Sequence, residues 1–497
     1  MNNIYLSKSR YCKARQCKKI IWLKKYKPEY AIQKARDIVL ENGTKVGQLA
    51  KGLFGKYENI DFNENLNIMI DQTKKLLKNK PNIITEASFN YNNNFCSVDI
   101  LKNDIDGVEI YEVKSSTEIS DIYLDDVSYQ YYILNNLEFN IKKACIVYIN
   151  NKYVKQGNLE LNKLFNIEDV TEIAKSKQQE IENNIYELNK YMEEHMDNEP
   201  KDDIGIKCFK PYECEFWEYC TRNLPKPNVF DIKGGMHLVK KFEKYYDGKI
   251  SFNDLQNENI NPKYLEQIDF ELNNLQPKID KDYIKEIIKA LNYPLYFLDY
   301  ETYQVAIPEI DGTRPYQQLP FQYSLHIIKE EGAAIEHKEF LAEIEDKDFI
   351  RHFAENLIKD IPDNGSVIIY NRAFEPARNK EIAEMYPDLK DELERINCNM
   401  IDFLEPFKQR KYYTKEMQGS ASIKYVLPAL YQKDSELDYH NLPVVHNGEE
   451  ASEAFLSLKG KSKEKQKEIR NGLLVYCQLD TYAMVKIWMK FKEILSK

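Results

Sequence analysis

The chain has 497 residues, of which 43% are hydrophobic and 30% are charged, so it is long enough for two to four domains and too apolar to be disordered throughout. It lacks any run of about 18 apolar residues, and its polar, basic start does not resemble a signal peptide, so we expect no membrane span and a cytoplasmic protein. The net charge of −10 excludes a uniformly basic nucleic-acid binder.

Charge is distributed unevenly along the chain. Residues 1–60 hold fourteen Lys and Arg against four Asp and Glu, a balance of +10, so the remaining residues together carry −20. A basic segment of this kind can contact phosphates, and the acidic remainder can include metal-binding carboxylates. A solvated, charged helix surface explains the same balance without any ligand, and both interpretations stay open.

The N-terminal part combines helices with a run of strands. Residues 10–60 and 62–80 have helical patterning, and Pro81 ends the second stretch. From residue 83 to residue 149 the pattern changes to strands, in ASFNYNNNFCSVDIL, GVEIYEVKSS and KKACIVYIN, with a helix around Val127–Leu137 before the third. The sequence therefore predicts an α/β domain over residues 1–225.

Four polar residues of these strands are candidates for a metal site. Glu86 opens the first strand, and Asp99 lies in the stretch FCSVDIL. Glu112 and Lys114 are two residues apart in YEVKSS, so their side chains lie on one face of that strand. The three carboxylates are expected to bind Mg²⁺ or Mn²⁺, while the Lys positions the nucleophile or stabilises developing charge.

The motif formed by Asp99, Glu112 and Lys114 resembles the core of the PD-(D/E)xK nucleases. The resemblance implies a restriction-endonuclease-like fold for the N-terminal domain. The following helix carries Gln130 and Tyr131 and is similar to the Gln-rich helix of RecB-type members, which implies that these two residues contact nucleic acid.

One departure from the RecB-type pattern concerns an early helix. Members usually carry a metal-binding His there, after a Gly, whereas the corresponding stretch NGTKVGQLAKGLF has Gly47 or Gln48 in that place. Two interpretations follow: a nuclease site built from acids alone, or a DNA-binding platform that does not cut.

Nine Cys in a cytoplasmic chain indicate thiols or metal ligands rather than disulfides. One Cys precedes an aromatic-apolar stretch in CKKIIWL, and three lie in CFKPYECEFWEYC, after the predicted nuclease core. This resembles iron–sulfur members of the RecB/AddB-like group, although the gap between the second and third Cys is longer here. The resemblance implies a [4Fe–4S] cluster, with Zn²⁺ as the alternative, held by Cys17, Cys208, Cys214 and Cys220.

The other cysteines have different expected roles. Cys12 is a rival for the N-terminal ligand position. The remaining four lie in apolar contexts and are expected to be buried thiols: Cys96, Cys145, Cys398 and Cys477.

A helical connector is expected between two strand-rich domains. A charged helix at residues 168–198 precedes the Cys segment and the Pro-rich break NLPKPNVF, and residues 226–290 are mostly helical and polar. A second α/β domain, residues 291–497, opens with YPLYFLDYETY and continues with PFQYSLHIIKE and GSVIIYN, each followed by helical sequence. The chain ends in an amphipathic helix at about Ser462–Leu495.

Carboxylates in this second domain form another candidate metal site. Asp299 and Glu301 lie two apart in one strand and therefore share a face. Glu375 is expected at the start of a helix, and Tyr476 and Asp480 lie four apart on one helical face. Four carboxylates can hold two Mg²⁺ or Mn²⁺ ions about 4 Å apart for phosphodiester hydrolysis, and the Tyr would orient the attacking water.

These residues resemble the motifs of the DEDD 3′–5′ exonuclease superfamily in its tyrosine-bearing form. The motifs are Asp-x-Glu at 299–301, Asn-x-x-Phe-Glu at 371–375 and Tyr-x-x-x-Asp at 476–480. The resemblance implies an RNase H-like fold with a mixed central sheet. Glu375 stands where the family usually has Asp, which would shift a bound metal.

Two further charged residues, Lys424 and Asp402, lie near these motifs. Lys424 follows the turn at Gly419–Ser420 and is either a phosphate contact or an ordinary exposed Lys. Asp402 is favoured for a structural role over a catalytic one.

The whole chain resembles bacterial fusions of a RecB-like nuclease with an RNase H-like exonuclease. The implied function is metal-dependent cleavage of DNA in repair or processing, by a 3′–5′ exonuclease in the C-terminal domain and a possible second site in the N-terminal domain. The alternatives are a non-catalytic nucleic-acid scaffold and an RNA-processing exonuclease. The chain has no P-loop motif, so a helicase or another repair or defence protein would be a separate partner.

Overall fold

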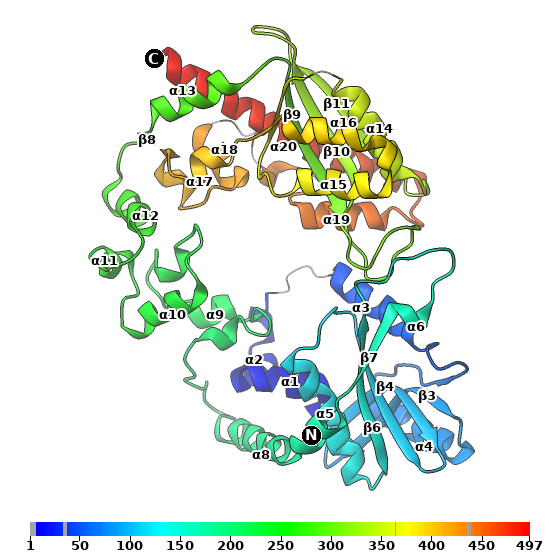
Figure 1. Ribbon diagram of the computed structural model, residues 1–497. Coiled ribbons are helices and arrows are strands. Elements are labelled where there is room, and N and C mark those ends of the chain that lie inside the picture. Colours follow the sequence, from blue (N-terminus) through cyan, green and yellow to red (C-terminus); the bar gives the residue numbers. More distant parts are fainter. Residues whose placement is uncertain (1–5, 33–36, 363, 433, 435–436, 438) are drawn as a thin grey trace. The chain divides into compact units, whose positions relative to one another are not determined.

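The computed structural model describes all residues except 1–5, 33–36, 363, 433, 435–436 and 438, and part of the predicted helix at 10–60 lies outside the described residues. The chain forms two compact units (Figure 1): unit 1 is Met1–Asn223 with Val305–Tyr316, and unit 2 is Leu224–Gln304 with Gln317–Lys497. Each unit contains helices and a mixed sheet, which confirms the predicted α/β class. Among the described residues, no helix is both long and apolar enough to cross a membrane.

Unit 1 begins with short helices and continues with a sheet. Its elements in chain order are β1 (Leu6–Ser7), α1 (Lys8–Gln16), α2 (Lys18–Tyr26), η1 (Pro28–Tyr30), α3 (Asp37–Ala50), β2 (Glu58–Asn59), α4 (Leu66–Asn79), β3 (Ile83–Tyr91), β4 (Asn94–Asp104), β5 (Gly107–Lys114), α5 (Asp121–Asn136), β6 (Ile141–Ile149), α6 (Leu161–Leu164), β7 (Phe165–Asp169), α7 (Thr171–Ser176), α8 (Gln178–Glu194), η2 (Ile206–Cys208) and α9 (Trp217–Thr221).

The sheet of unit 1 has the order β2-β3-β4-β5-β6-β7, and β1 pairs with β4 outside this path. β3, β4 and β5 form an antiparallel meander, and α5 then carries the chain across to β6, which runs parallel to β5. β4 and β5 are paired from Asp104 opposite Gly107 to Ile100 opposite Tyr111. Asp99 and Glu112 therefore lie immediately beyond the last pair, Ile100 and Tyr111, one on each strand.

Unit 2 contains the expected connector and the second sheet. Its elements are η3 (Val229–Asp231), α10 (Leu238–Tyr246), α11 (Phe252–Leu255), α12 (Pro262–Asn273), β8 (Lys278–Ile279), α13 (Lys281–Ala290), β9 (Leu295–Tyr303), β10 (Leu319–Ile328), β11 (Glu336–Leu341), α14 (Phe349–Asp360), β12 (Ser366–Ile369), α15 (Glu375–Met385), η4 (Pro387–Leu389), α16 (Lys390–Cys398), β13 (Met400–Asp402), α17 (Glu405–Lys408), β14 (Tyr412–Tyr413), η5 (Lys415–Met417), α18 (Ile423–Leu430), η7 (Tyr439–Asn441), α19 (Gly448–Ser457) and α20 (Lys463–Ser496).

The main sheet of unit 2 has the order β11-β10-β9-β12-β13. β11, β10 and β9 are antiparallel, whereas β12 and β13 run parallel to β9. The central strand β9 is LYFLDYETY, and every residue of it is buried or nearly so. Such a strand is hydrophobic on both faces because helices cover both sides of the sheet.

Ring contacts show which helix covers which face of β9. Phe297 packs edge to face against Trp488 of α20, with ring centroids 6.3 Å apart. Tyr300 packs against Phe353 of α14 on the opposite face, at 4.9 Å. Because side chains alternate along a strand, the residues that share a face with Phe297 also point toward α20.

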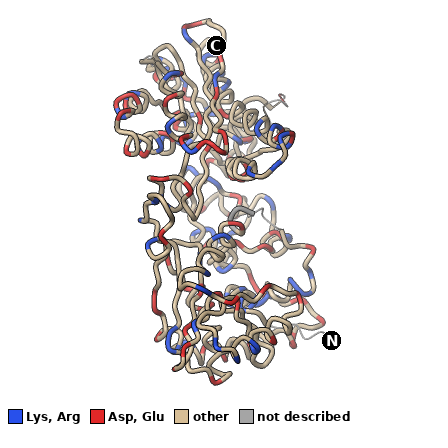
Figure 2. Tube along the Cα trace, turned by 90° about the vertical axis from the view of Figure 1, so that its right-hand side faces the viewer, with Lys and Arg blue, Asp and Glu red and all other residues tan. Residues whose placement is uncertain are grey.

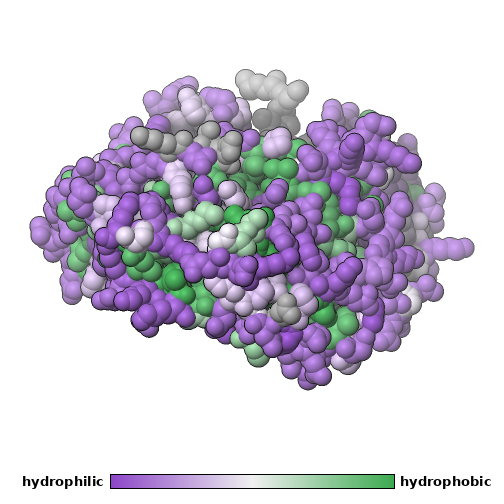
Figure 3. Space-filling model, turned by 90° about the horizontal axis from the view of Figure 1, so that it is seen from above, coloured by the Kyte–Doolittle hydropathy of each residue, from purple (hydrophilic) through white to green (hydrophobic). Residues whose placement is uncertain are grey.

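The surface carries both signs of charge. Lys and Arg are interspersed with Asp and Glu along the trace in Figure 2, and the face seen in Figure 3 is mainly hydrophilic with apolar side chains between polar ones. Apolar atoms are a normal part of a protein surface, so these views by themselves identify no ligand site.

Candidate functional site

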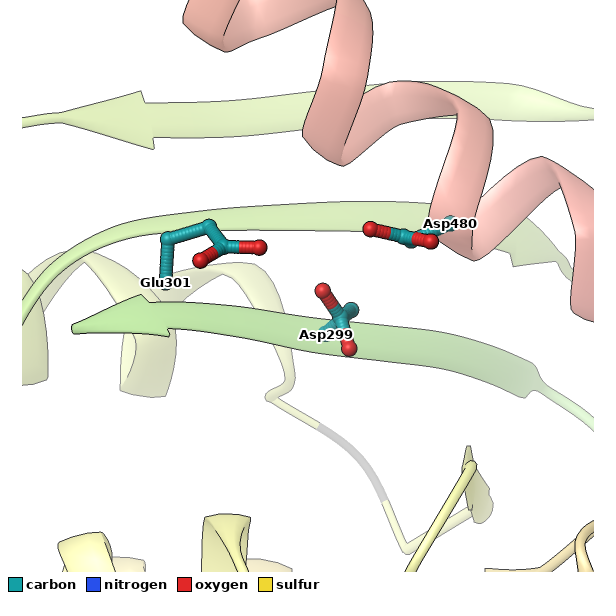
Figure 4. Close-up of side chains that lie close together, drawn as sticks. All are labelled: Asp299, Glu301 and Asp480. Atoms are coloured by element: carbon teal, nitrogen blue, oxygen red, sulfur yellow. The ribbon is translucent and has the colours of Figure 1, made fainter. Parts of the chain in front are cut away.

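Three carboxylates of unit 2 converge between β9 and α20. Asp299 and Glu301 leave the same face of β9, and Asp480 extends from α20 toward them (Figure 4). One oxygen from each of the three lies within 4.8 Å of the others. The structure thus brings together three of the acids that the sequence singled out, and we call them the acid centre.

Burial makes the acid centre electrostatically costly. The pKa of Asp299 is raised well above its usual range by burial and by the charges of Asp480, Glu301 and Glu375. Burial also raises the pKa of Glu301, and it raises the pKa of Asp480 to about 6. Carboxylates in such surroundings are stable as anions only when a cation joins them.

No ion pair with Lys or Arg neutralises the acid centre within the described part of the chain. The nearest cation is Lys424, whose charge lowers the pKa of Glu301 and Asp480. Its ammonium group donates instead to the carbonyl oxygen of His446 at 3.0 Å and lies over the rings of Tyr439 and Tyr476. The Lys424 side chain is partly exposed.

Two tyrosines border Asp480. Tyr476 lies one turn before it on α20, as predicted, and its ring is 6.2 Å from that of Tyr439. The Tyr439 hydroxyl donates to Asp480 Oδ1 at 2.6 Å. Tyr439 was not among the predicted residues, because nothing in its local sequence indicates a contact with a helix 41 residues later.

Glu375 lies at the start of α15, as predicted, and its side chain is only 2% exposed. Burial raises its pKa to about 8, and the charge of Asp402 adds to the rise. Its Oε2 atom is buried and has no hydrogen-bond partner among the described residues. Although Glu375 is outside the group of three, its charge acts on both Asp299 and Glu301, so it borders the acid centre.

Asp402 holds the turn that leads into α15. Its carboxylate accepts hydrogen bonds from the backbone N–H groups of Asn371, Arg372 and Leu404 at 2.8–3.0 Å. Asn371 has a φ of 104°, a conformation that costs energy for a residue other than Gly. Asp402 therefore has the structural role that was favoured, and it fixes where Glu375 enters the site.

The donor set of the acid centre fits a hard divalent cation. Mg²⁺ and Mn²⁺ prefer oxygen ligands, and carboxylates are their usual protein donors. Asp299, Glu301 and Asp480 supply three such groups within reach of one another, and the unpartnered Oε2 atom of Glu375 is a fourth. Their raised pKa values are the expected consequence of burying metal ligands without their metal.

The predicted N-terminal site is arranged differently, because lysines occupy it. The ammonium group of Lys8 donates to both carboxylate oxygens of Glu112 at 2.8 Å and lies 3.7 Å from Asp99 and 3.8 Å from Asp126. Lys114 binds Glu112 at 2.7 Å and Asp126 at 2.5 Å. These five side chains form what we call the lysine-filled centre. Lys8 and Asp126 were not predicted: Lys8 is 104 residues from Glu112, and Asp126 lies on the following helix, outside the motif itself.

The other predicted residues of this region do not join the lysine-filled centre as expected. Glu86 lies inside β3 rather than opening it and has a φ of 59°. Its carboxylate pairs with Lys51 at 3.2 Å and accepts from Ser97 at 3.3 Å. Glu86 and Gln48 line the same pocket, of about 340 Å³. Within the described chain, no contact joins Glu86 to Asp99 or Glu112.

Gln130 and Tyr131 are buried, which corrects their assignment to nucleic-acid contacts. Gln130 donates to Glu112 at 2.6 Å and has no exposed surface. Tyr131 packs in the main hydrophobic core of unit 1. Both lie on α5, which packs against four strands of the sheet. Gln130 faces the sheet and is hydrogen-bonded to Glu112 there.

The structure gathers the four predicted cysteine ligands. Cys17 lies between α1 and α2, where it packs with Cys214 and Cys220 around an aromatic cluster that includes Trp22 and Phe216. The backbone N–H of Cys214 donates to the carbonyl of Cys208 at 2.7 Å. Burial raises the pKa of Cys214 to about 12, and the charges of the other three cysteines add to the rise. Four thiolates are a ligand set that iron–sulfur clusters and Zn²⁺ both use.

The rival ligand and the remaining cysteines lie elsewhere. Cys12 packs against the main core of unit 1, near Asp126 and Lys114 rather than near the other cysteines. Cys96, Cys145 and Cys477 are buried, as expected, but Cys398 is exposed. The expectation for Cys398 was wrong because it is the last residue of α16, where the helix surface turns toward solvent.

Comparisons with known proteins find similarity to sequences that have no assigned activity. Residues 296–422 match the family model described as "Domain of unknown function (DUF2779)". This range contains Asp299, Glu301 and Glu375 but ends before Tyr476 and Asp480. No solved structure matches the chain.

The chain is also similar to uncharacterized proteins of mollicute bacteria. It is 25% identical to MG366 of Mycoplasma genitalium over 223 residues, which is 40% of this chain and 32% of that protein. It is 26% identical to UU173 of Ureaplasma parvum over 305 residues, which is 57% of this chain and 43% of that protein. The matched part of the chain therefore spans less than half the length of these relatives.

Proposed function

We propose that unit 2 is a metal-dependent nuclease that hydrolyses phosphodiester bonds of DNA as a 3′–5′ exonuclease. The observation that carries the proposal is the acid centre, in which the partly buried Asp299 and the buried Glu301 and Asp480 converge without an ion-pair partner in the described chain. A divalent cation is the ligand that such a group stabilises best. Phosphodiester hydrolysis is a reaction that cations in this setting promote.

The roles of the side chains follow from their positions. Asp299, Glu301, Asp480 and Glu375 would hold Mg²⁺ or Mn²⁺, which when bound polarises the phosphate and activates water. The Tyr476 hydroxyl borders Asp480 and would orient the attacking water. Lys424 would meet a phosphate oxygen beside the centre after releasing the carbonyl oxygen of His446. Tyr439 keeps Asp480 in one orientation through its 2.6 Å hydrogen bond.

Two further observations support an RNase H-like fold of the DEDD type for unit 2. Its five-stranded sheet is mixed, with the acidic strand β9 at the centre. The Tyr-x-x-x-Asp motif lies on α20, which packs on the face of β9 that carries Asp299 and Glu301.

For unit 1 we propose a RecB-like PD-(D/E)xK fold with a cysteine-bound cluster. The meander β3-β4-β5, the crossover helix α5 and the parallel strand β6 suit that fold. The cysteine spacing favours [4Fe–4S] over Zn²⁺. A tetrahedral zinc site with bonds of about 2.3 Å places its sulfurs about 3.8 Å apart. Within the described chain, no three cysteine sulfurs lie within 4.8 Å of one another.

The test is cleavage of end-labelled single- and double-stranded DNA and RNA with Mn²⁺, Mg²⁺ or EDTA. We expect a ladder of products that requires the metal and that Asp299→Asn and Asp480→Asn abolish. Glu375→Gln tests the fourth acid in the same assay. Its matched control is Glu384→Gln, because Glu384 is an exposed acid on the same helix. The control should cleave like the wild type.

The same assay separates the alternatives. Full activity in Asp299→Asn would rule out the acid centre as the nuclease. Tight binding of DNA without cleavage under any condition would favour the scaffold function. A ladder on RNA alone would favour RNA processing.

A further inference from the structure

The N-terminal acids already have a cation. Lys8 makes two 2.8 Å hydrogen bonds to Glu112, one to each oxygen, and its ammonium group lies within 3.8 Å of both Asp99 and Asp126. One ammonium group thus touches or approaches three carboxylates from two strands and a helix. A divalent metal held by Asp99 and Glu112 would occupy the same position.

The backbone around Lys8 fixes the side chain in this place. Leu6 and Ser7 form β1, which pairs in parallel with Asn94 and Phe95 of β4. The Leu6 carbonyl accepts a 2.5 Å hydrogen bond from the buried hydroxyl of Tyr129 on α5. Ser7 then caps α1, whose first residue is Lys8. Strand pairing before Lys8 and a capped helix after it leave little freedom to withdraw the side chain.

Charge and space both oppose a metal ion beside Lys8. The centre holds the carboxylates of Asp99, Glu112 and Asp126 against the ammonium groups of Lys8 and Lys114, a balance of −1. A divalent ion would reverse that sign and would lie against two cations. Mg²⁺ also demands oxygen ligands at about 2.0–2.1 Å, and Lys8 and Gln130 already engage the oxygens of Glu112.

The acid centre of unit 2 provides the contrast within one chain. Its carboxylates have no ion pair with a Lys or Arg in the described residues, whereas the buried Glu112 has two lysine partners. Buried acids need a positive charge beside them. In unit 1 the lysines supply that charge, whereas in unit 2 a bound cation would have to supply it.

We propose that Lys8 is the resident cation of the N-terminal centre and takes the place of a divalent metal between Asp99 and Glu112. The lysine-filled centre of unit 1 therefore holds no divalent metal, whereas the cysteine site of the same unit is unaffected by this argument. Unit 1 contributes binding rather than hydrolysis, and cleavage belongs to unit 2 alone. The assignment of hydrolysis to unit 2 rests on the proposed function, but the occupancy of the centre by Lys8 does not.

The experiment counts bound Mn²⁺ from the loss of the free-ion signal in electron paramagnetic resonance, on the full chain. The background is Asp299→Asn with Asp480→Asn, which removes the acid centre. Lys8→Met keeps the length of the side chain and removes its charge. We expect the background protein to bind no Mn²⁺ at this centre and the Lys8→Met protein to bind about one more ion per chain. Adding Glu112→Gln should abolish that ion.

Lys13→Met is the matched control. Lys13 lies on the same helix, but it pairs with Glu215 and has no contact with the N-terminal acids in the described chain. It should leave the count unchanged. Unfolding curves show whether the Lys8→Met protein folds. If it does not fold, the proposal is still tested by adding Glu112→Gln to the background protein that keeps Lys8.

Two outcomes overturn the proposal. A bound ion in the background that Glu112→Gln removes would show that metal displaces Lys8. An unchanged count in a folded Lys8→Met protein would show that these acids form no cation site. Because the measurement needs no cleavage, a failure of the nuclease assignment does not affect it.

Discussion

Glu112 and Glu375 are both only 2% exposed, yet their surroundings differ in kind. Lys8 and Lys114 bind the carboxylate of Glu112, whereas one oxygen of Glu375 has no partner among the described residues. Burial raises the pKa of Glu375 to about 8, although the charge of Arg378 lowers it in part. At the scale of single residues, the distinction between a structural and a ligand-binding acid therefore lies in its counter-charge rather than in its depth.

His326 gives a prediction about acid stability. It is buried on β10, and burial together with the charge of His337 lowers its pKa to about 4. Since the unfolded value is about 6.5, the unfolded chain binds more protons between pH 6.5 and 4. The stability that depends on neutral His326 is present above pH 6.5 and is lost as the pH falls, by up to roughly 3 kcal/mol.

His326→Gln should flatten that loss, as measured by urea unfolding at pH 7.5 and pH 4.5. His352→Gln is the control with the opposite sign. The hydrogen bond and charge of Asp346 raise the pKa of His352, so this variant should lose stability at acidic pH. Parallel pH profiles for wild type and His326→Gln would contradict the prediction.

The sequence predicted the acids of both centres except Asp126, and it missed several of the residues that surround them. Spacing of two in a strand and four in a helix was enough to place Asp299 with Glu301 and Tyr476 with Asp480. Tyr439 and Lys8 depend on contacts 41 and 104 residues away, which no local pattern encodes. Local sequence patterns therefore gave the least information about whether an acid of either centre has a lysine partner.

Close packing along α20 gives a prediction at the scale of an element. A Cβ atom at Gly472 would lie 2.6 Å from the Cβ atom of Val444. Gly→Ala within a helix normally stabilises by about 1 kcal/mol. Here the overlap should make Gly472→Ala destabilising by roughly 1–3 kcal/mol, because the helix that carries Asp480 must shift.

Thermal unfolding measures the effect, and a double-mutant cycle assigns it. Val444→Gly removes the overlapping atom, so the double variant should recover part of the loss. Asn471→Ala, at the exposed neighbouring position, should be close to neutral. A stabilised Gly472→Ala protein would show that α20 does not pack tightly at this point.

Long elements were easier to predict than short ones. The final helix was expected at about Ser462–Leu495 and is observed at Lys463–Ser496, because its amphipathic pattern is long and Ser462 caps it. β7 and β11 were not predicted. Both are short strands at the edge of a sheet and largely exposed, so they lack the apolar run that identifies a buried strand.

For the whole molecule, the two centres predict how divalent metal affects stability. Mn²⁺ at about 100 times its dissociation constant should stabilise the protein by about 2.7 kcal/mol through the acid centre. That corresponds to a rise of roughly 5–10 °C in unfolding temperature, which EDTA should reverse.

At one fixed Mn²⁺ concentration, the gain should be larger at pH 8 than at pH 6, because protons compete with the metal for the carboxylates. Burial raises the pKa of Asp480 to about 6 and that of Glu375 to about 8, so the metal-free protein loses stability as the pH rises through these values. Calorimetry at both pH values measures the effect. An equal gain in Asp299→Asn would contradict it.

The α/β class could be predicted for the whole chain, but the path of the chain between the units could not. Alternation of strand and helix patterns indicates sheets covered by helices. Nothing in the segment Val305–Tyr316 indicates that it belongs to unit 1, although the strands on either side of it, β9 and β10, lie in unit 2. Membership of this kind is decided by packing, which sequence patterns do not record.

That path has a consequence for work with fragments. Ala306 is fully buried in a core of unit 1 that also contains Val46 and Ile100, and Lys155 exchanges backbone hydrogen bonds with Gly312 and Thr313. A protein expressed from residues 1–223 alone would lack this piece of its own interior and expose the surface beneath it. A faithful excision would join 305–316 to that fragment through a linker, and the shortened unit 2 would need a new turn from Gln304 to Gln317.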